Sequence, residues 1–383
     1  MCIRDRVRAE LAKPEICALV KPGMRIAVGV GSRGIQNLYT IVETTVNSLK
    51  ELGVEPFIVS AMGSHGGGTE EGQREVLAGY GITEERLGVP VVTTVDTVYL
   101  GNCANGRPVW FDRAAYEADL IVPINRVKLH TDFVGPIQSG LCKMLVIGLG
   151  NHKGCSAVHE EAPEVFADAI EETARLILQK APVGFGIAIL ENAYDKTYAV
   201  EAVPAEHLVE REKELVQIAK GNMPYIMLDE ADVIVCGAIG KDISGAGFDP
   251  NILGRSSVLK QFVLHIPRYQ RLVLCDVTPA SHGNGIGVGL FDVITKKVAE
   301  QLDLESMYAN AIACNCLGDA SVPCTVDDEE TAIRVALKCC RNIDRDHPRI
   351  IRIQNTLHLG EIEVSEALLD AVHADSRMSL IEN

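Results

Sequence analysis

The sequence has few aromatic residues and no excess of positive charge. Aromatic side chains make up 5% of it, and 36 basic residues stand against 52 acidic ones, which gives a formal net charge of −16 at pH 7. Such a chain repels nucleic-acid phosphates and anionic lipid surfaces unless a local basic patch overrides the average. We find no such patch in the sequence, so we expect neither nucleic acid nor a membrane as a partner.

Long apolar runs and ordered cysteine patterns are also missing. No apolar stretch reaches the length that is needed to cross a bilayer. The twelve cysteines are scattered, and the closest groups, Cys314 with Cys316 and Cys339 with Cys340, lack the two-residue gap of structural zinc sites. No secretory segment precedes them, so we expect a reducing cytoplasm and interpret these thiols as core residues.

What the sequence does contain is an alternation of apolar strands and helix-period stretches. Residues 25–30 read as a strand, residues 36–52 as a helix and residues 56–60 as the next strand, which together make a βαβ unit. We give no structural weight to the opening six residues, MCIRDR. The pattern recurs with helices at 74–80, 114–117, 164–180 and 205–220, and with strands at 89–94, 119–124 and 185–190.

Turn residues at 221–224 interrupt this series and indicate a domain boundary. A second series follows, with strands at 231–235 and 271–275, a helix at 293–302 and a helix-strand-helix run from residue 329. The sequence therefore predicts two α/β domains, residues 1–222 and 223–383, with mostly parallel, Rossmann-like sheets. We expect the active site in a cleft between the two domains.

A glycine turn follows the first strand. Gly29, Gly31 and Gly34 form a literal G-x-G-x-x-G, which is typical of dinucleotide sites when an acidic residue ends the second strand. That strand instead ends in Ser60 with no acidic residue after it, so we disfavour NAD binding. Arg33 on the turn is a candidate to hold a substrate carboxylate, with a solvated surface arginine as the alternative.

Two histidines follow two different strands. His65 lies in the glycine-rich loop after the strand at 56–60, and His130 follows the strand at 119–124. The carboxyl ends of parallel strands meet at one edge of a sheet, where ligands bind in open α/β folds. Imidazole titrates near neutral pH, so one histidine can accept a proton while the other donates one, as the inversion of a stereocentre requires.

A lysine and a glycine-rich segment come next. Lys143 stands among apolar residues, where desolvation favours an uncharged, nucleophilic amine, although a lysine that extends to solvent from the edge of the core fits equally well. The segment 148–154 is interpreted as a loop whose backbone amides face a phosphate. His159 follows sixteen residues after Lys143.

The order His65, His130, Lys143 and His159 resembles that of the nickel-dependent lactate racemase family, in a divergent branch. In that family one histidine lies on a glycine-rich loop after the second strand, and a second precedes a glycine-rich segment that ends in a lysine. A third lies sixteen residues after the lysine. The sequence departs from the pattern at Ser64–Gly67 and Ser139–Cys142, and it lacks the tyrosine-glutamine-x-x-lysine motif of the second domain.

The resemblance implies a nickel-pincer nucleotide, a pyridinium mononucleotide with thioamide and thiocarboxylate groups, bound covalently by Lys143. It implies that His159 is the protein ligand of the nickel, and that His65 and His130 alternate as acid and base. The implied reaction racemises or epimerises a small 2-hydroxy acid by hydride transfer to the cofactor. Because simple deprotonation of such a carbon is very unfavourable, hydride transfer is the easier route.

The second domain offers a substitute for the missing motif. Lys241 follows a predicted strand and is a candidate to pair with the substrate carboxylate, with a structural ion pair as the alternative. Proteins that synthesise the cofactor are expected partners, and a homo-oligomer is left open. The competing interpretations are an NAD-linked oxidoreductase or hydro-lyase, and a metal- or nucleotide-binding protein without catalysis.

Overall fold

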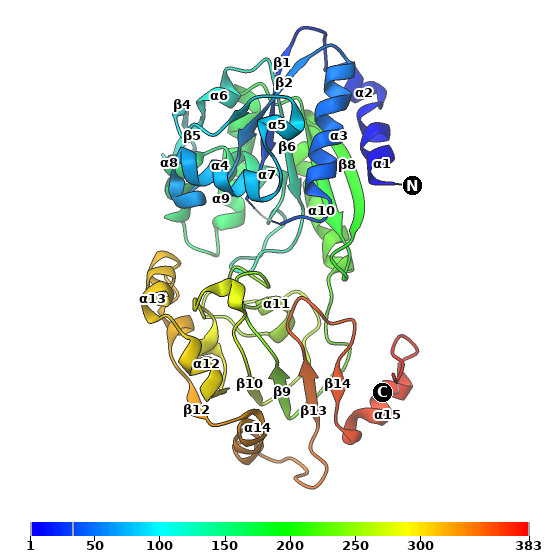
Figure 1. Cartoon of the computed structure of the whole chain (residues 1–383), viewed down its shortest axis with the longest axis vertical. Coiled ribbons are helices and arrows are strands. Elements are labelled where there is room, and N and C mark those ends of the chain that lie inside the picture. Colours follow the sequence, from blue (N-terminus) through cyan, green and yellow to red (C-terminus); the bar gives the residue numbers. More distant parts are fainter. Residues whose placement is uncertain (1, 33, 382–383) are drawn as a thin grey trace. The chain divides into compact units, whose positions relative to one another are not determined.

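A computed structural model describes residues 2–32 and 34–381 of the chain. The chain divides into two compact units, Met1–Met223 and Pro224–Asn383, which we call the N-terminal and C-terminal units (Figure 1). Each unit has its own mostly parallel sheet and its own core, so the predicted α/β fold class is confirmed.

The N-terminal unit contains a six-stranded sheet in the order β3-β2-β1-β6-β7-β8. All neighbouring strands pair in parallel except β7 and β8. The central strands are buried on both faces, which explains their continuous apolar sequences. The strands are β1 (Arg25–Val30), β2 (Glu55–Ser60), β3 (Val91–Val92), β6 (Leu120–Arg126), β7 (Phe185–Glu191) and β8 (Thr197–Pro204).

Helices cover this sheet, and a separate hairpin of β4 (Thr97–Asn102) and β5 (Pro108–Asp112) adjoins it. The hairpin was not predicted, because β4 is partly exposed along its length and lacks a clear apolar alternation. The helices are α1 (Ile3–Leu11), α2 (Pro14–Cys17), α3 (Leu38–Glu51), α4 (Glu70–Gly79), α5 (Glu84–Leu87), α6 (Arg113–Tyr116), α7 (Leu141–Lys143), α8 (Asn151–His159), α9 (Phe166–Lys180) and α10 (Leu208–Asn222).

The treatment of the opening residues as structurally irrelevant is wrong. Ile3–Arg6 form the first turn of α1, which packs against α3 and contributes Val7 and Leu11 to the core of the N-terminal unit. The error has a simple cause, because charged residues alternate with single apolar ones in this segment. Only the helical repeat places Val7 and Leu11, four residues apart, on the same face.

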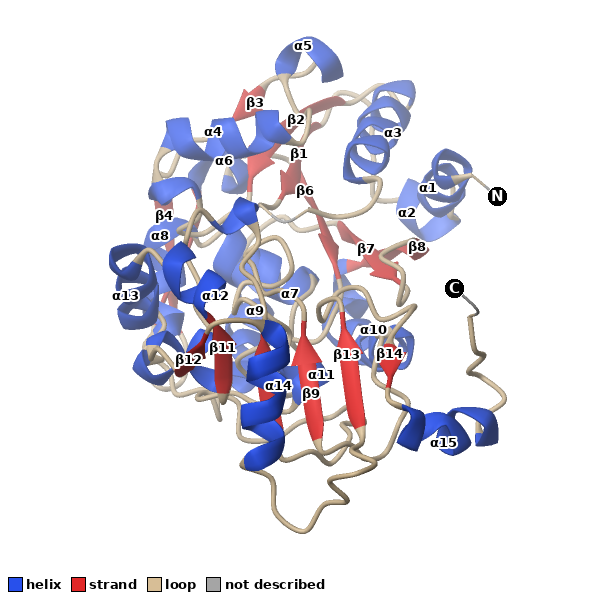
Figure 2. Cartoon of the chain, turned by 60° about the horizontal axis from the view of Figure 1, so that its bottom comes forward, coloured by secondary structure: helices blue, strands red, loops and turns tan. Residues whose placement is uncertain are grey.

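The C-terminal unit has a sheet in the order β12-β11-β10-β9-β13-β14, in which the β13–β14 pair is antiparallel. Residues of β9 alternate between two apolar clusters, and Figure 2 shows α14 lying across the strands on one side. The strands are β9 (Val233–Cys236), β10 (Arg271–Leu274), β11 (Val293–Thr295), β12 (Cys324–Val326), β13 (Ile350–Ile353) and β14 (Glu363–Val364), and the helices are α11 (Pro250–Leu253), α12 (Lys296–Gln301), α13 (Leu304–Ala313), α14 (Glu329–Lys338) and α15 (Leu369–Ala374).

The helix expected at 293–302 is partly wrong. Its first three residues form β11, which pairs with β10 and β12, and α12 begins only at Lys296. Val293 and Ile294 are β-branched residues that suit a buried strand, and Thr295 caps the helix by accepting the N–H of Val298. The neighbouring strands therefore decided the conformation.

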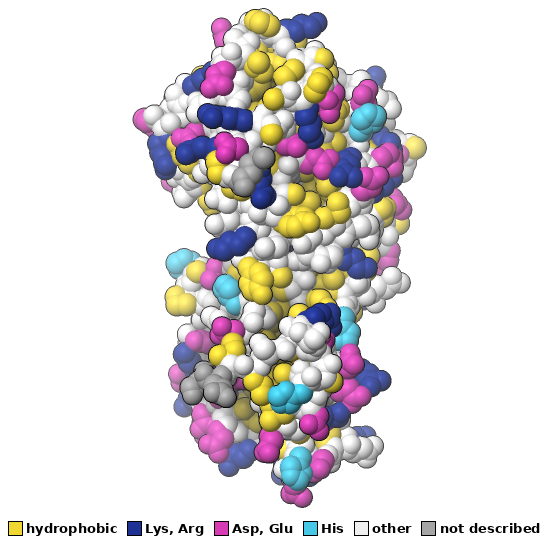
Figure 3. All heavy atoms as spheres, turned by 90° about the vertical axis from the view of Figure 1, so that its right-hand side faces the viewer, with side chains coloured by type: hydrophobic (Ala, Val, Ile, Leu, Met, Phe, Trp, Pro, Cys, Tyr) yellow, Lys and Arg dark blue, Asp and Glu magenta, His cyan; other side chains and the backbone are white. Residues whose placement is uncertain are grey.

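Among residues 2–32 and 34–381, no helix combines the length and the apolar character that crossing a bilayer demands. On the face drawn in Figure 3, acidic and basic side chains are interspersed over each of the two units.

Candidate functional site

The carboxyl ends of β1, β2 and β6 lie at one edge of the N-terminal sheet. The chain passes from β1 outward to β2 and β3, and later returns to form β6 on the other side of β1. The strand order therefore reverses at β1. In open α/β proteins, the loops on the two sides of such a reversal run in opposite directions and leave a crevice in which ligands bind. The candidate residues Ser32, His65 and His130 follow these three strands.

The glycine turn after β1 is explained by close packing. A Cβ atom on Gly31 would lie 3.1 Å from the side chain of Met144, and one on Gly29 would lie 3.5 Å from the backbone of Pro123. Helix α3 begins only at Leu38, so its N-terminus does not follow directly on the glycines as a dinucleotide site requires. Arg33, the predicted substrate ligand on this turn, lies outside the described residues.

His65 is an exposed residue in the loop after β2. Its ring Nδ1 is in hydrogen-bond contact with the hydroxyl of Ser32 from the loop after β1. The Ser32 carbonyl in turn accepts a hydrogen bond from the hydroxyl of Tyr80 at 2.8 Å. Two neighbouring strand ends are thus linked through one imidazole, whose orientation is set by a hydroxyl group.

His130 is held by its own loop. Its backbone N–H donates to the side chain of Gln138 at 2.7 Å, and its ring stacks on Phe133 with 4.3 Å between the ring centres. The backbone N–H of Asp132 donates to ring Nδ1 at 3.1 Å. Because a backbone N–H only donates, Nδ1 carries no proton in this arrangement, and Nε2 is the protonated nitrogen of the neutral ring.

Lys143 is the partner of that nitrogen. Its Nζ lies 2.5 Å from His130 Nε2, and it ends the short helix α7, directly before a π-helical turn at Met144–Gly148. A protonated Nε2 donates to Lys143, and the lysine nitrogen can accept only as an uncharged amine. Such π-helical turns are frequent at functional sites. The geometry therefore favours a nucleophilic lysine.

His159 ends helix α8 and has the opposite tautomer. Its Nδ1–H donates to the carbonyl of Cys155, four residues earlier, at 2.8 Å, which leaves Nε2 as the nitrogen with a lone pair. The pKa of His159 is raised mainly because the Cys155 sulfur, 3.4 Å from Nδ1, accepts from the ring N–H, whereas burial lowers it by a smaller amount. The ring also meets Phe166 edge-on at 5.2 Å.

The aromatic contacts connect the two ends of this group. Phe133, which stacks on His130, lies 4.9 Å from Phe166, and Phe166 contacts His159. Lys143 contacts His130 directly and so joins the same chain of contacts. The described structure therefore brings together three of the four residues of the predicted constellation.

The loop that carries His65 packs against helix α8 through the residues that precede His65. The thiol of Cys155 contacts the hydroxyl of Ser64 at 3.8 Å, and the N–H of Gly63 donates to the carbonyl of Gly148 at 3.0 Å. Burial raises the pKa of the Cys155 thiol, but contacts with His159 and Ser64 outweigh burial and leave it below its ordinary value. Helix α8 and the His65 loop are therefore packed together.

The structure also shows where the predicted phosphate loop and the predicted substrate ligand Lys241 lie. The segment 148–154 is not an open loop, because it joins the π-helical turn to α8 and the Gly154 N–H donates to Gly150 within the helix. The N–H groups of Leu149 and Gly154 are used within the helical segment, and the binding of a phosphate by the other amides stays a prediction. Lys241 lies in the C-terminal unit, where its amine donates to the carbonyl of Gly245 and to the side chain of Asn310.

Sequence reasoning missed three side chains that support the site. Ser32 and Cys155 contact the predicted histidines, and Cys155 was detectable because it precedes His159 by one helical turn. Glu212 lies beneath Lys143 but far from it in the sequence, and no local pattern pointed to it. Among the described residues, no group of three or more His, Cys, Asp or Glu side chains is arranged to hold a metal ion.

Comparison with known proteins gives a family match and a fold match. Residues 2–168 match the family model of the lactate racemase N-terminal domain. The lactate racemase apoprotein from Thermoanaerobacterium thermosaccharolyticum is structurally similar, with 14% identity, a TM-score of 0.55 and coverage of 92% of this chain and 91% of that one.

A structural-genomics target from Thermotoga maritima shows 14% identity and a TM-score of 0.49, over 71% of this chain and 70% of that one. This similarity is too low to support an inference. A search among curated protein sequences found no match.

Proposed function

We propose, from the match of residues 2–168 to the lactate racemase N-terminal domain family, that the chain is an isomerase that inverts the stereocentre of a small 2-hydroxy acid. The observation that carries the proposal is the contact of the Lys143 amine with His130 at 2.5 Å, beside His159 and at the edge of the sheet where α/β proteins bind ligands. Racemisation and epimerisation both fit this site.

His65 and His130 act as the acid and the base in this proposal. They follow different strands of one sheet edge, so they can approach a planar intermediate from different sides. Ser32 orients His65 through Nδ1, and Asp132 orients His130 in the same way. One ring removes the substrate hydroxyl proton while the other returns a proton at the end of the reaction. Arg33 and Lys241 are proposed to bind the substrate carboxylate.

The site chemistry fits a nickel-pincer nucleotide. Lys143 offers an uncharged amine for a covalent link, and His159 directs the lone pair of Nε2 away from its bond to Cys155, as metal-binding histidines do. When bound, such a group supplies an acceptor for the hydride of the substrate carbon. His159 would then hold the nickel through Nε2.

The proposal extends to the cell. We propose that the chain works in the cytoplasm, where thiols such as Cys155 stay reduced, and that cofactor-synthesis proteins load it. Whether copies of the chain associate is a separate question, which sedimentation or light scattering of the purified protein answers.

Intact-protein mass spectrometry tests the proposal most directly. The chain is produced together with cofactor-synthesis proteins, and a nucleotide-sized mass increase on Lys143 with about one nickel per chain is expected. The matched control is Lys143→Arg, which keeps a cation but removes the nucleophilic amine. An unmodified Lys143 under conditions that load an authentic lactate racemase contradicts the covalent link.

Activity is measured separately. Chiral chromatography of a panel of 2-hydroxy acids should show interconversion of one of them in both directions. A change in nicotinamide absorbance on substrate addition would instead support an NAD-linked oxidoreductase.

A further inference from the structure

Glu212 is a buried carboxyl group for which the proposed chemistry has no use. It lies on α10, its side chain is fully buried, and α10 packs against α7, the short helix that ends in Lys143. A charged group is expensive to bury without a cation. Its contact with the turn Gly140–Lys143, which carries the candidate nucleophile, therefore needs an explanation.

The carboxyl group of Glu212 faces the first backbone amides of that turn. The N–H of Cys142 donates to Oε2 at 2.8 Å, and the N–H of Leu141 also favours the charged carboxylate. The other oxygen, Oε1, has no hydrogen-bond partner within residues 2–32 and 34–381. Burial prevails over these hydrogen bonds and raises the pKa of Glu212 to about 7.

The turn is built to admit this carboxyl group. A Cβ atom on Gly140 would lie 2.6 Å from the Glu212 carboxyl, so only glycine fits at this position. From the opposite side, the side chain of Asn125 donates to the Gly140 carbonyl at 2.8 Å, and Ser139 exchanges two backbone hydrogen bonds with Lys128. The turn is thus held between the end of β6 and helix α10.

We infer that Glu212 is a positioning residue, which fixes the Gly140–Lys143 turn by accepting its amide hydrogens and thereby holds the Lys143 amine against His130. Both contacts lie within one helical turn of backbone, because Cys142 immediately precedes Lys143. The inference rests on the proposed function only for what the amine does afterwards. The placement of the amine can be measured on the protein without any cofactor.

The other charged groups that act on the Cys142 thiol lie on α9 and are paired with each other. Glu171 and Arg175 on α9 act weakly on the Cys142 thiol and are joined by a hydrogen bond of 2.7 Å. Lys143 itself faces His130 and His159. Among the charged groups named here, Glu212 is therefore the one that contacts the turn through its backbone amides.

The test is trace labelling of the purified chain with acetic anhydride over a range of pH. Only uncharged amines react, so the pH midpoint of the labelling rate of Lys143, compared with that of the exposed Lys338, reports its protonation, whereas accessibility changes only the maximal rate. In the parent protein, Lys143 should lose its proton at a lower pH than Lys338. Glu212→Gln should move the Lys143 midpoint toward that of Lys338 and speed amide exchange at Leu141 and Cys142 by about five- to tenfold, as for a lost helix cap.

Two further variants separate positioning from general stability. Gly140→Ala leaves Glu212 in place but pushes the turn away from it, and it should produce the same shift at Lys143. Glu214→Gln, on the exposed side of the same helix, should leave Lys143 unchanged. An unaltered Lys143 profile in both Glu212→Gln and Gly140→Ala, with both proteins folded by circular dichroism, would overturn the inference. A missing racemase activity would not affect it.

Discussion

The two units use the same sheet plan but place different chemistry on it. In each, the first strand lies inside the sheet, the chain moves outward to one edge and returns on the other side, and the last strand is antiparallel. The loops of the N-terminal sheet carry His65 and His130. The corresponding loops of the C-terminal sheet carry Lys241, Thr278 and Ser281, which bond to their own neighbours. The fold supplies the edge, and only the loops make it reactive.

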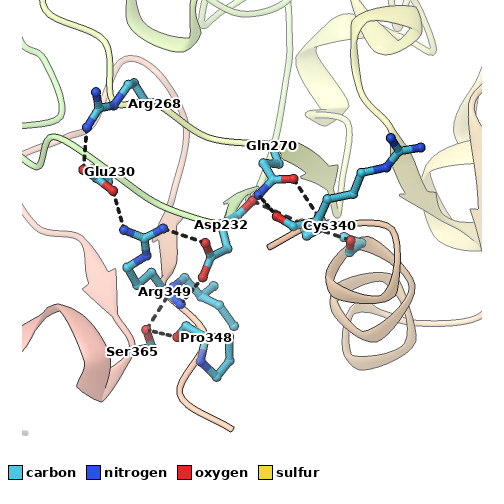
Figure 4. A network of polar contacts seen from close by, with 11 residues as sticks. Glu230, Asp232, Arg268, Gln270, Cys340, Pro348, Arg349 and Ser365 are labelled. Carbon is cyan, nitrogen blue, oxygen red and sulfur yellow. Dashed lines mark hydrogen bonds and ion pairs between the residues drawn. The ribbon is translucent and has the colours of Figure 1, made fainter. Parts of the chain in front are cut away.

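The two units also differ in the partners of their acidic side chains. In the N-terminal unit, burial raises the pKa of Asp112 to about 6 and that of Glu212 to about 7. Asp112 accepts the side-chain amide of Asn151 in α8, and Glu212 accepts the N–H of Cys142 in α7. In the C-terminal unit, the buried Asp232 and the partly exposed Glu230 are paired with arginines in the network of Figure 4. Asp112 and Glu212 are thus held by N–H donors of the chain, whereas Asp232 and Glu230 are held by arginine cations.

The largest expected effect is the loss of catalytic rate when a candidate histidine of the N-terminal unit is replaced. Because a positioned acid or base typically contributes about a hundred- to ten-thousand-fold in rate, His65→Ala and His130→Ala should each lower interconversion by that factor in both directions. The matched control is His282→Ala, an exposed histidine in a loop of the C-terminal unit, which should retain full activity. Chiral chromatography on the cofactor-loaded chain gives the rates. An equal loss in all three variants would break the comparison.

The next largest expected effect is a loss of unfolding free energy when a buried cation is removed. The Arg107 side chain is only 5% exposed and pairs with Glu161 and Glu172, which ties the β4–β5 hairpin to α9. Arg107→Met keeps the apolar stem but leaves both carboxylates unpaired, which should cost roughly 3 kcal/mol of unfolding free energy. Denaturant unfolding followed by circular dichroism measures the change. A loss far below this would show that solvent already screens the pair.

The buried acid Glu212 should make stability depend on pH. Its pKa is about 7 in the folded chain and lies near its ordinary value after unfolding, so the folded state binds the proton more tightly. The stabilisation is complete below about pH 4.5 and is lost as the pH rises toward 7, by roughly 3 kcal/mol. Glu212→Gln should flatten this slope in urea unfolding curves, whereas Glu214→Gln should keep it. An unchanged slope in Glu212→Gln would disprove the assignment.

The smallest effect is expected at the exposed ion pairs of the C-terminal unit. Arg268 contacts Glu230, but its side chain is 81% exposed, and water screens such a pair almost completely. Arg268→Ala should leave the unfolding midpoint within the error of a thermal scan. A clear destabilisation would mean that the network of Figure 4 acts as a unit, contrary to its exposure.

Much of the architecture could be predicted from local patterns. The strand at 25–30 coincides with β1, and the helix at 164–180 contains α9, because apolar periodicity and end residues lie within the segments themselves. The predictions failed where the position of a segment in the sheet, and not its own sequence pattern, determines its conformation. Val293–Thr295 became a strand because β10 and β12 lie beside it, and the antiparallel edge strand β8 was missed because it is partly exposed.

For the candidate site, the sequence alone determined which residues carry reactive groups and that two histidines follow strands of one parallel sheet. Only the tertiary structure decided that Lys143 meets His130, that Cys155 fixes the tautomer of His159 and that Glu212 lies beneath the turn. The physical reason is the range of the forces involved. Periodicity and capping act over a few residues, whereas desolvation and hydrogen bonding depend on which distant segments the fold packs together.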